Sequence, residues 1–245
     1  MESGALLLTA TITPRPGVPH LRVTDTAQRR QEYLTSLAFA MTLDPKIITT
    51  IVFAENSGAD LSAFKILAER DDRVELLSVE PRPIEASWGR GYMETCLVLD
   101  AAMTSKRPLT ATGVIWKTTG RYVVHNIARI VAKARPGKDL YVNLRTYPRP
   151  WVDMWVYGTT AHGLQLLQKS LPAMPDTPDQ PTEQRLYGIV RDLMDRGEQI
   201  QPRLHVEPFI TGIRGWDGRP YNSVRQRAKW VLRSATKAVA PSIWI

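Results

Sequence analysis

The 245-residue sequence contains one cysteine, Cys96, and no apolar run long enough to cross a lipid bilayer. A single cysteine excludes a disulfide-stapled scaffold and makes a reducing compartment the default expectation. Residues 4–12 are apolar, but they lack a basic leader and a cleavage site, and Pro14 ends the run short of the roughly 20 residues that a span needs. We interpret residues 4–12 as a buried strand.

Acidic residues are scarce in the last part of the chain. Residues 212–245 hold seven Lys or Arg and one acid, Asp217, a net charge of +6 in a chain whose total is +8. This charge favours a polyanionic partner: a nucleotide phosphate, nucleic acid or an anionic membrane. Residues 224–239 have helical spacing, with apolar residues toward one face and basic residues on much of the other. An anionic surface attracts such a helix, although a merely solvated face is an equally good interpretation.

Apolar runs alternate with segments of helical period, which predicts an α/β fold with a mostly parallel sheet flanked by helices. The predicted strands are 4–12, 46–53, 74–79, 113–117, 140–144, 151–158 and 204–207. The predicted helices are 24–41, 61–70, 93–104, 123–134, 160–170, 183–195 and 224–239. We expect an α/β core over residues 1–170. Residues 171–245 would add a proline-rich connection, a mobile loop at 212–218 and the basic helix, within one integrated domain.

Polar residues follow the predicted strands at their carboxyl ends, where open α/β sheets bind ligands. Hydroxyl and amide groups suit a base and ribose, and cations suit a diphosphate. The candidate nucleotide partners are therefore Thr9, Thr11, Glu55, Asn56, Lys117, Arg121 and Arg145.

Structural interpretations compete with these assignments. Glu55 and Asn56 can cap the following helix, and Lys117 and Arg121 can be surface charges. Arg145 can pair with Asp139 or Asp153. Two other reactive side chains, His125 and Cys96, are interpreted as structural and as buried and inert.

Five blocks, in this order, resemble bacterial and phage glycosyltransferase-like proteins with a GT-A-like nucleotide-sugar fold: LLLTATITP, IVFAENSGADLS, GRGYMET, WKTTGRYVVHNI and PFITGIRGWDGRPY. The resemblance covers roughly residues 5–222, and KTTGRY is its most specific part. It implies a hexosyl- or pentosyltransferase that moves a sugar from a nucleoside diphosphate, such as a UDP-sugar, to an acceptor hydroxyl.

The resemblance also implies roles for individual residues. An inverting enzyme needs a base for the acceptor proton, and Glu94 and Asp153 are the carboxylate candidates. The GIRGWDGRPY segment implies a lid that excludes water, with acceptor-side residues Arg214, Trp216 and Tyr221.

The sequence departs from the GT-A pattern at one place. Asn143-Leu144-Arg145 stands where an Asp-x-Asp motif would hold a divalent cation on the donor phosphates. Arginine cannot bind a cation, but it can neutralise a diphosphate through paired hydrogen bonds. We therefore expect no metal ligands, little dependence on Mn²⁺ or Mg²⁺ and no certain cofactor, with Lys117, Arg121 and Arg145 on the phosphates.

The acceptor stays open at this point. An envelope glycan predicts a cytoplasmic enzyme in peripheral contact with the anionic inner membrane face. A hydroxymethylated base of phage DNA, flipped out of the duplex, predicts an enzyme of the host cytoplasm. The alternative function is a non-enzymatic, basic α/β nucleic-acid-binding module, which leaves KTTGRY without a role. A methyltransferase ranks last because no Gly-x-Gly follows the first strand.

Overall fold

The computed structural model describes residues 3–19, 21–107, 109, 113–177, 179–240 and 244. Its main sheet has seven strands in the order β10-β6-β9-β4-β1-β2-β3. The strands are β1 (Gly4–Ala10), β2 (Ile48–Glu55), β3 (Val74–Ser78), β4 (Val114–Thr119), β6 (Leu140–Tyr141), β9 (Val156–Thr159) and β10 (Ile200–Gln201). Strand β9 runs antiparallel to β4 and β6, and the other pairings are parallel. The predicted mixed α/β fold with a mostly parallel sheet is confirmed.

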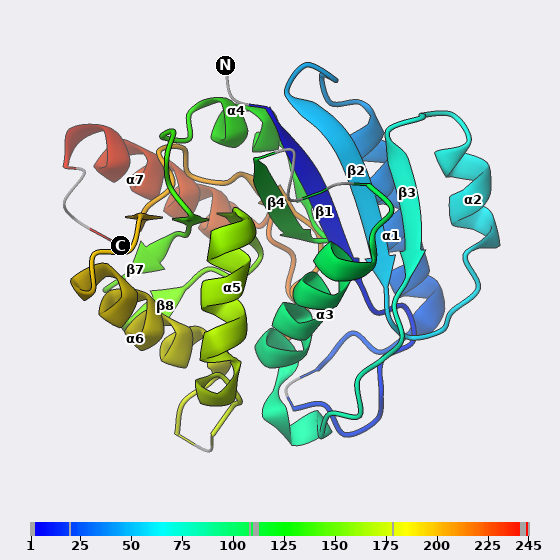
Figure 1. The fold of residues 1–245 in the computed structure, drawn as a ribbon, viewed down its shortest axis with the longest axis horizontal. Helices are drawn as coiled ribbons and strands as arrows, with labels where there is room; N and C mark the ends of the chain where they lie inside the picture. Colours follow the sequence, from blue (N-terminus) through cyan, green and yellow to red (C-terminus); the bar gives the residue numbers. More distant parts are fainter. Residues whose placement is uncertain are drawn as a thin grey trace.

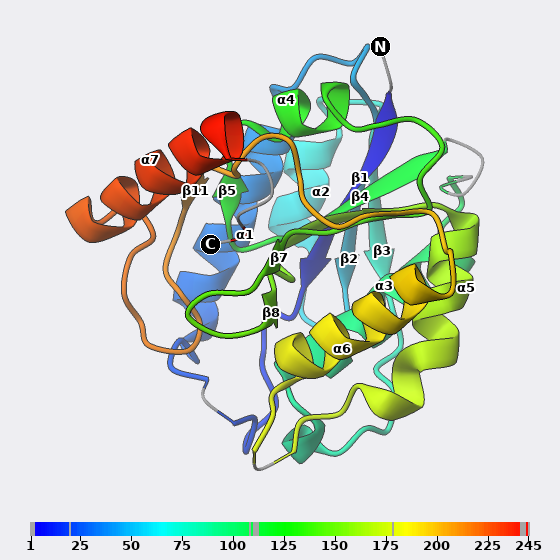
Figure 2. The ribbon, with the colours of Figure 1, turned by 90° about the vertical axis from the view of Figure 1, so that its left-hand side faces the viewer.

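Helices cover both faces of this sheet (Figure 1, Figure 2). One face carries α1 (Thr26–Met41), α2 (Ser62–Ala68) and α4 (Ile127–Ala132), and the other carries α3 (Arg90–Thr104), α5 (Ala161–Ser170) and α6 (Thr182–Asp195). Successive side chains of β1 point to opposite faces, so Leu6 and Leu8 join the first core while Ala5 and Leu7 join the second. This double burial explains why β1 is apolar along most of its length.

Smaller elements surround the carboxyl edge of the sheet. Strand β5 (Val123–Val124) pairs with β11 (Ile210–Thr211), and β7 (Leu144–Arg145) pairs with β8 (Trp151–Val152), both antiparallel. Two 3₁₀ turns, η1 (Ala86–Trp88) and η3 (Leu171–Ala173), precede α3 and follow α5. Helix α7 (Val224–Val239) lies at the outer edge of the molecule, at the end opposite α2 (Figure 1).

Some predicted boundaries are wrong. Residues 123–134 begin as strand β5 before α4, the predicted strand 151–158 is divided into β8 and β9, and residues 204–207 form no strand. Helix α3 begins at Arg90 instead of 93, directly after Gly89, whose φ of 87° lies in the left-handed region. Strand β10 belongs to the part of the chain after residue 170 yet pairs with β6 in the main sheet.

No helix of the described ranges is both long and apolar enough to cross a membrane.

Candidate active site at the carboxyl ends of β1 and β4

A carboxylate from α3 lies between the ends of the two central strands. Thr9 of β1 and Thr119 of β4 are partners in the parallel register. Both hydroxyls donate to Oε1 of Glu94, at 2.6 Å from Thr9 and 2.7 Å from Thr119. The sheet register therefore fixes the position of this carboxylate at the edge where α/β folds bind ligands.

Lys117 of β4 is the third side chain that contacts the Glu94 carboxylate. Its side chain is fully buried, and its ammonium lies 2.7 Å from Oε1 of Glu94 and donates to the Met154 carbonyl at 2.5 Å. Burial lowers the pKa of Lys117, and the charge of Glu94 opposes that shift. The ammonium also lies 5.5 Å from the ring centre of Tyr157, whose hydroxyl is buried and has no hydrogen-bond partner in the described structure. Lys117 thus holds and neutralises Glu94 instead of presenting its charge to solvent.

The second oxygen of Glu94 is available. All three contacts of this carboxylate converge on Oε1, and within the described ranges no hydrogen bond or ion pair reaches Oε2. The side chain of Glu94 keeps 21% of its surface exposed. A carboxylate fixed through one oxygen and open at the other can accept a proton from a bound hydroxyl.

Arg90, one turn before Glu94 on α3, supplies a cation that the sequence analysis missed. Arg90 is half-buried, and its guanidinium has no ion pair or hydrogen bond with any described residue. A side chain at Gly215 would meet this guanidinium at 2.8 Å, so Arg90 lies beneath the segment 212–218. Arg90 stands in the block GRGYMET, but the sequence predicts a helix that begins at residue 93. The place of Arg90 in the first turn of α3 is therefore known only from the structure.

A second acid, Glu183 in the first turn of α6, lies in the same region. Burial raises the pKa of Glu183, the positive charge of Arg90 lowers it, and the negative charge of Glu94 raises it. The first turns of α3 and α6 are packed together, since a side chain at Gly91 would meet Thr182 at 2.8 Å. The site therefore contains two carboxyl groups in different environments and one arginine, Arg90, which acts on Glu183 through its charge but makes no hydrogen bond or ion pair with a described residue.

The loops after β1 and β2 are joined by the predicted donor-binding residues. The buried Glu55 carboxylate accepts the backbone N–H groups of Ile12 at 3.0 Å and Ser57 at 2.9 Å. Thr11 donates its hydroxyl to Oδ1 of Asn56 at 2.7 Å. The structure brings these predicted residues to the same sheet edge as Thr9, with Glu55 inside the loops as their support.

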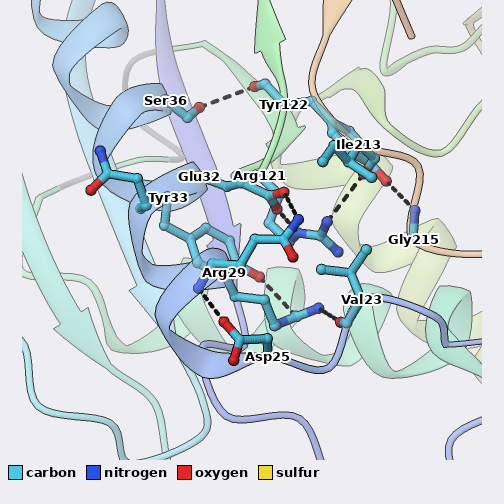
Figure 3. Close-up of polar contacts among 12 residues, drawn as sticks. Val23, Asp25, Arg29, Glu32, Tyr33, Ser36, Arg121, Tyr122, Ile213 and Gly215 are labelled. Carbon is cyan, nitrogen blue, oxygen red and sulfur yellow. Dashed lines mark hydrogen bonds and ion pairs between the residues drawn. The ribbon is translucent and has the colours of Figure 1, made fainter. Parts of the chain in front are cut away.

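Arg121 connects α1 to the segment 212–218 (Figure 3). Its Nε donates to Oε2 of Glu32 at 2.5 Å, and a terminal nitrogen donates to the Ile213 carbonyl at 3.1 Å. Nearby, Arg29 donates to the Val23 carbonyl (Figure 3) and also to the Thr11 carbonyl. Arg121 is 5% exposed and already has a carboxylate partner, so most of its guanidinium is occupied by the protein.

Arg145 and Asp153 meet each other. Arg145 forms ion pairs with Asp153 and, at 3.0 Å, with Glu207, and all three side chains are buried. Asn143 donates to the same Asp153 oxygen at 2.8 Å. The structural pairing of Arg145 with Asp153 that the sequence analysis left open is therefore present, with Glu207 as a third member that it did not foresee.

The segment predicted as a lid is folded back on itself beside the site. The backbone N–H of Tyr221 donates to the Gly212 carbonyl at 2.9 Å, and Gly215 accepts at 2.8 Å from the N–H of Arg22 in the loop after β1. Arg214 pairs with Asp217 at 2.6 Å and lies 5.2 Å from the ring centre of Trp216. Trp216 is 53% exposed, whereas Tyr221 packs edge-on against Tyr122.

The described residues contain no group of three or more His, Cys, Asp or Glu side chains placed to hold a metal ion. Negative charge at the site comes from Glu94 and Glu183, and positive charge from Lys117 and Arg90. Such a set can bind a phosphorylated ligand through Arg90 and accept a proton at Glu94.

No protein-family model and no curated protein matches the chain. The inositol-1-phosphate CTP transferase from T. maritima is 10% identical, with a TM-score of 0.51 over 97% of this chain and 98% of its own. The 4-diphosphocytidyl-2C-methyl-D-erythritol synthase from Anaerococcus prevotii is 9% identical, with a TM-score of 0.50 over 96% of this chain and 95% of its own. A glycosyltransferase involved in the glycosylation of the major capsid of PBCV-1 is 10% identical, with a TM-score of 0.46 over 81% and 82%. At these identities the likeness is one of fold alone: over nearly its whole length the chain has the α/β fold of the CTP transferase and of the erythritol synthase.

Proposed function

We propose that this protein is a glycosyltransferase that moves a sugar from a nucleoside diphosphate to an acceptor hydroxyl. The observation that carries the proposal is the Glu94 carboxylate, fixed through Oε1 by Thr9, Thr119 and Lys117 and open at Oε2. It stands at the sheet edge that binds ligands in open α/β folds. The unpaired Arg90 one turn away supports the same assignment.

The reaction uses the open oxygen as a base. Oε2 of Glu94 takes the proton of the acceptor hydroxyl while the hydroxyl oxygen bonds to the anomeric carbon. The bond from that carbon to the diphosphate oxygen breaks, and the electron pair leaves with the diphosphate. Arg90 neutralises the charge that develops on the leaving group. This in-line displacement inverts the anomeric centre.

We place the donor diphosphate next to Arg90, because the other cations of the site are already paired with carboxylates. Arg121 is paired with Glu32, and Arg145 with Asp153 and Glu207, so both guanidinium groups are neutralised inside the protein. Lys117 is likewise neutralised by Glu94. A cation without a carboxylate partner gains most from a bound phosphate, because its charge is not already compensated. Asp153 receives no catalytic role here, since Arg145 and Asn143 hold its carboxylate.

The surrounding loops provide the remaining contacts. The loops after β1 and β2, which Thr11, Asn56 and Glu55 join, bind the nucleoside of the donor. The segment 212–218 covers Arg90, and the exposed Trp216 ring offers a stacking surface to a sugar of the acceptor. Closure of this segment excludes water and suppresses hydrolysis of the donor.

A thermal-shift screen of UDP-, GDP-, CMP- and dTDP-sugars tests the proposal. A donor at about 100 times its dissociation constant stabilises the fold by about 2.7 kcal/mol. We expect stabilisation by one donor class, followed by transfer to a hydroxyl acceptor. Stabilisation by CTP alone would assign nucleotidyl transfer, and no shift with any nucleotide would leave the nucleic-acid-binding alternative.

Two acceptor classes suit the charge of the chain, an envelope glycan and a hydroxymethylated base of DNA. For duplex DNA, log K falls with log salt at a slope of about −0.9 for each phosphate neutralised. Transfer to duplex containing hydroxymethylated bases, with that salt dependence, would establish the DNA acceptor. Transfer to a lipid-linked or free glycan would establish the other.

A further inference from the structure

Helix α7 is attached to the protein through its polar face. Lys237 lies 3.0 Å from the buried Glu207 carboxylate and donates to the Leu204 carbonyl at 2.7 Å. Arg233 lies 4.0 Å from the same carboxylate, and the Trp230 indole donates to the Glu207 backbone carbonyl at 3.1 Å. Residues 230, 233 and 237 share one helix face because they are three and four positions apart. This face, which amphipathicity alone would direct to solvent, is the one packed on the protein.

The opposite face of α7 is apolar and exposed. Val224, Val231, Leu232 and Val239 are 86%, 58%, 59% and 83% exposed, and no residue of the helix is buried. At 100° per residue these four positions, together with Ala228 and Ala235, occupy one face. Such a stripe costs free energy in water and marks a surface that contacts another apolar phase.

Basic residues border the stripe on both sides. At the helical rotation Arg227 lies on one side of it, and Arg225 and Lys229 lie on the other; all three are exposed. The helix projects at the edge of the molecule (Figure 2), and the exposed fractions of its valine and leucine side chains show that the stripe is uncovered. An apolar centre with cationic borders is the pattern that lies in the headgroup region of a bilayer.

We propose that α7 docks the protein on an anionic lipid surface, with the valine and leucine stripe in the headgroup and acyl boundary and the three cations on lipid phosphates. A second copy of the chain is disfavoured, since it would bring an equally basic helix against the first. Nucleic acid would engage the cations but leave the apolar stripe in water. This inference does not depend on the proposed glycosyl transfer.

Vesicle co-sedimentation of the full chain tests the docking. Phosphatidylcholine vesicles are compared with vesicles containing one quarter phosphatidylglycerol, at low and at physiological salt. We expect binding to the anionic vesicles that weakens with salt, and none to the neutral ones. The double variant Arg225→Gln/Lys229→Gln should lose about 25-fold in affinity, from about fivefold for each basic residue near the surface.

Two further variants make the test specific. Val231→Ser/Leu232→Ser removes exposed apolar surface, so the melting temperature should be unchanged while vesicle binding falls at least tenfold. The control Lys169→Gln/Arg191→Gln removes two exposed charges from other helices and should bind like the wild type. Four results would overturn the proposal: no binding to anionic vesicles, equal binding to neutral vesicles, a dimer that the Val231/Leu232 variant dissociates, or duplex DNA binding with no vesicle binding.

Discussion

The Lys117 ammonium lies 2.7 Å from Oε1 of Glu94, and the lysine is fully buried while the glutamate keeps 21% of its side-chain surface exposed. The two partners therefore depend on each other unequally. Without Glu94, Lys117 would be a buried cation with no carboxylate. Without Lys117, Glu94 would still have water and two hydroxyl donors.

This asymmetry predicts the effect of removing each partner. Glu94→Gln should lower the free energy of unfolding by about 3 kcal/mol, the lower end of the range for breaking a buried pair because Glu94 is partly exposed. Lys117→Met should cost less, and the double variant should recover part of the loss of Glu94→Gln. Urea unfolding of the three variants measures these values. Equal losses for both single variants would contradict the unequal dependence.

Glu94→Gln also separates catalysis from donor binding. The amide cannot take the acceptor proton, so kcat should fall by about 100-fold or more. Donor affinity, measured by calorimetry, should change less than threefold. Glu183→Gln is the matched comparison, because Glu183 belongs to the same site; a larger loss of kcat for that variant would transfer the role of the base to Glu183.

Arg90 should control donor affinity. Arg90→Ala removes a charge-assisted contact to a phosphate, worth about 1.5–3 kcal/mol, so the dissociation constant of the donor should rise by about 10- to 150-fold. Arg90 has no ion pair or hydrogen bond with the described residues, but its charge favours the buried carboxylate of Glu183, so the variant should unfold at a temperature slightly below that of the wild type. Arg191→Ala, an exposed arginine on α6, is the control. Unchanged affinity in Arg90→Ala, with loss in Arg121→Ala, would return the phosphate to the arginine of the KTTGRY block.

The long elements could be predicted from the sequence. Strands β1, β2 and β4 contain the apolar runs ALLL, IVFA and VIW, and α6 and α7 have clear helical periodicity, which is weaker in α1. Strands β5, β10 and β11 have two residues each, which is too short for any period to be read, and none of them was predicted. Strands β6, β7 and β8 are also two residues long, and they fall within or at the end of the predicted strands 140–144 and 151–158. They form because the main fold brings their partners alongside.

The pairing of the site's charges could not be predicted. Arg145 had two nearby acids in the sequence, but its further partner, Glu207, is 62 residues away. The same residue determines which face of α7 packs on the protein, because the buried Glu207 carboxylate attracts Lys237 and Arg233. A helical pattern shows that two faces differ, and only the position of a distant carboxylate decides which face is covered.

Chelation should have little effect on transfer. Arg90 provides positive charge at the proposed diphosphate position, and Asn143-Leu144-Arg145 stands where the resemblance leads us to expect an Asp-x-Asp motif. We expect turnover in EDTA within twofold of turnover with added Mn²⁺ or Mg²⁺. Loss of activity in EDTA that Mn²⁺ restores would place a metal on the donor phosphates, and Glu94 and Glu183 would be the first ligands to substitute.

The carboxylate of Glu207 should make the protein sensitive to acid. Burial raises its pKa, but Arg145 and Lys237 lower it further, so the folded-state pKa lies below the usual value. A carboxyl group with a depressed folded pKa stabilises the fold above its unfolded pKa, and this contribution disappears as pH falls through the folded value. Glu207→Gln should therefore lower the free energy of unfolding by about 3–5 kcal/mol at pH 7, as expected when a buried pair loses one partner.

The difference between wild type and Glu207→Gln should then shrink below about pH 4, because the wild-type carboxyl is being protonated as well. Urea unfolding at pH 7, 5, 4 and 3 measures this convergence. Glu198→Gln is the matched control: Glu198 pairs at 3.1 Å with His162, whose side chain is 48% exposed, and its loss should cost less than about 1 kcal/mol. A gap for Glu207→Gln that stays constant down to pH 3 would mean that Glu207 acts through packing and not through its charge. In that case the ion pairs of Arg233 and Lys237 with Glu207 would not explain why the apolar stripe of α7 faces outward.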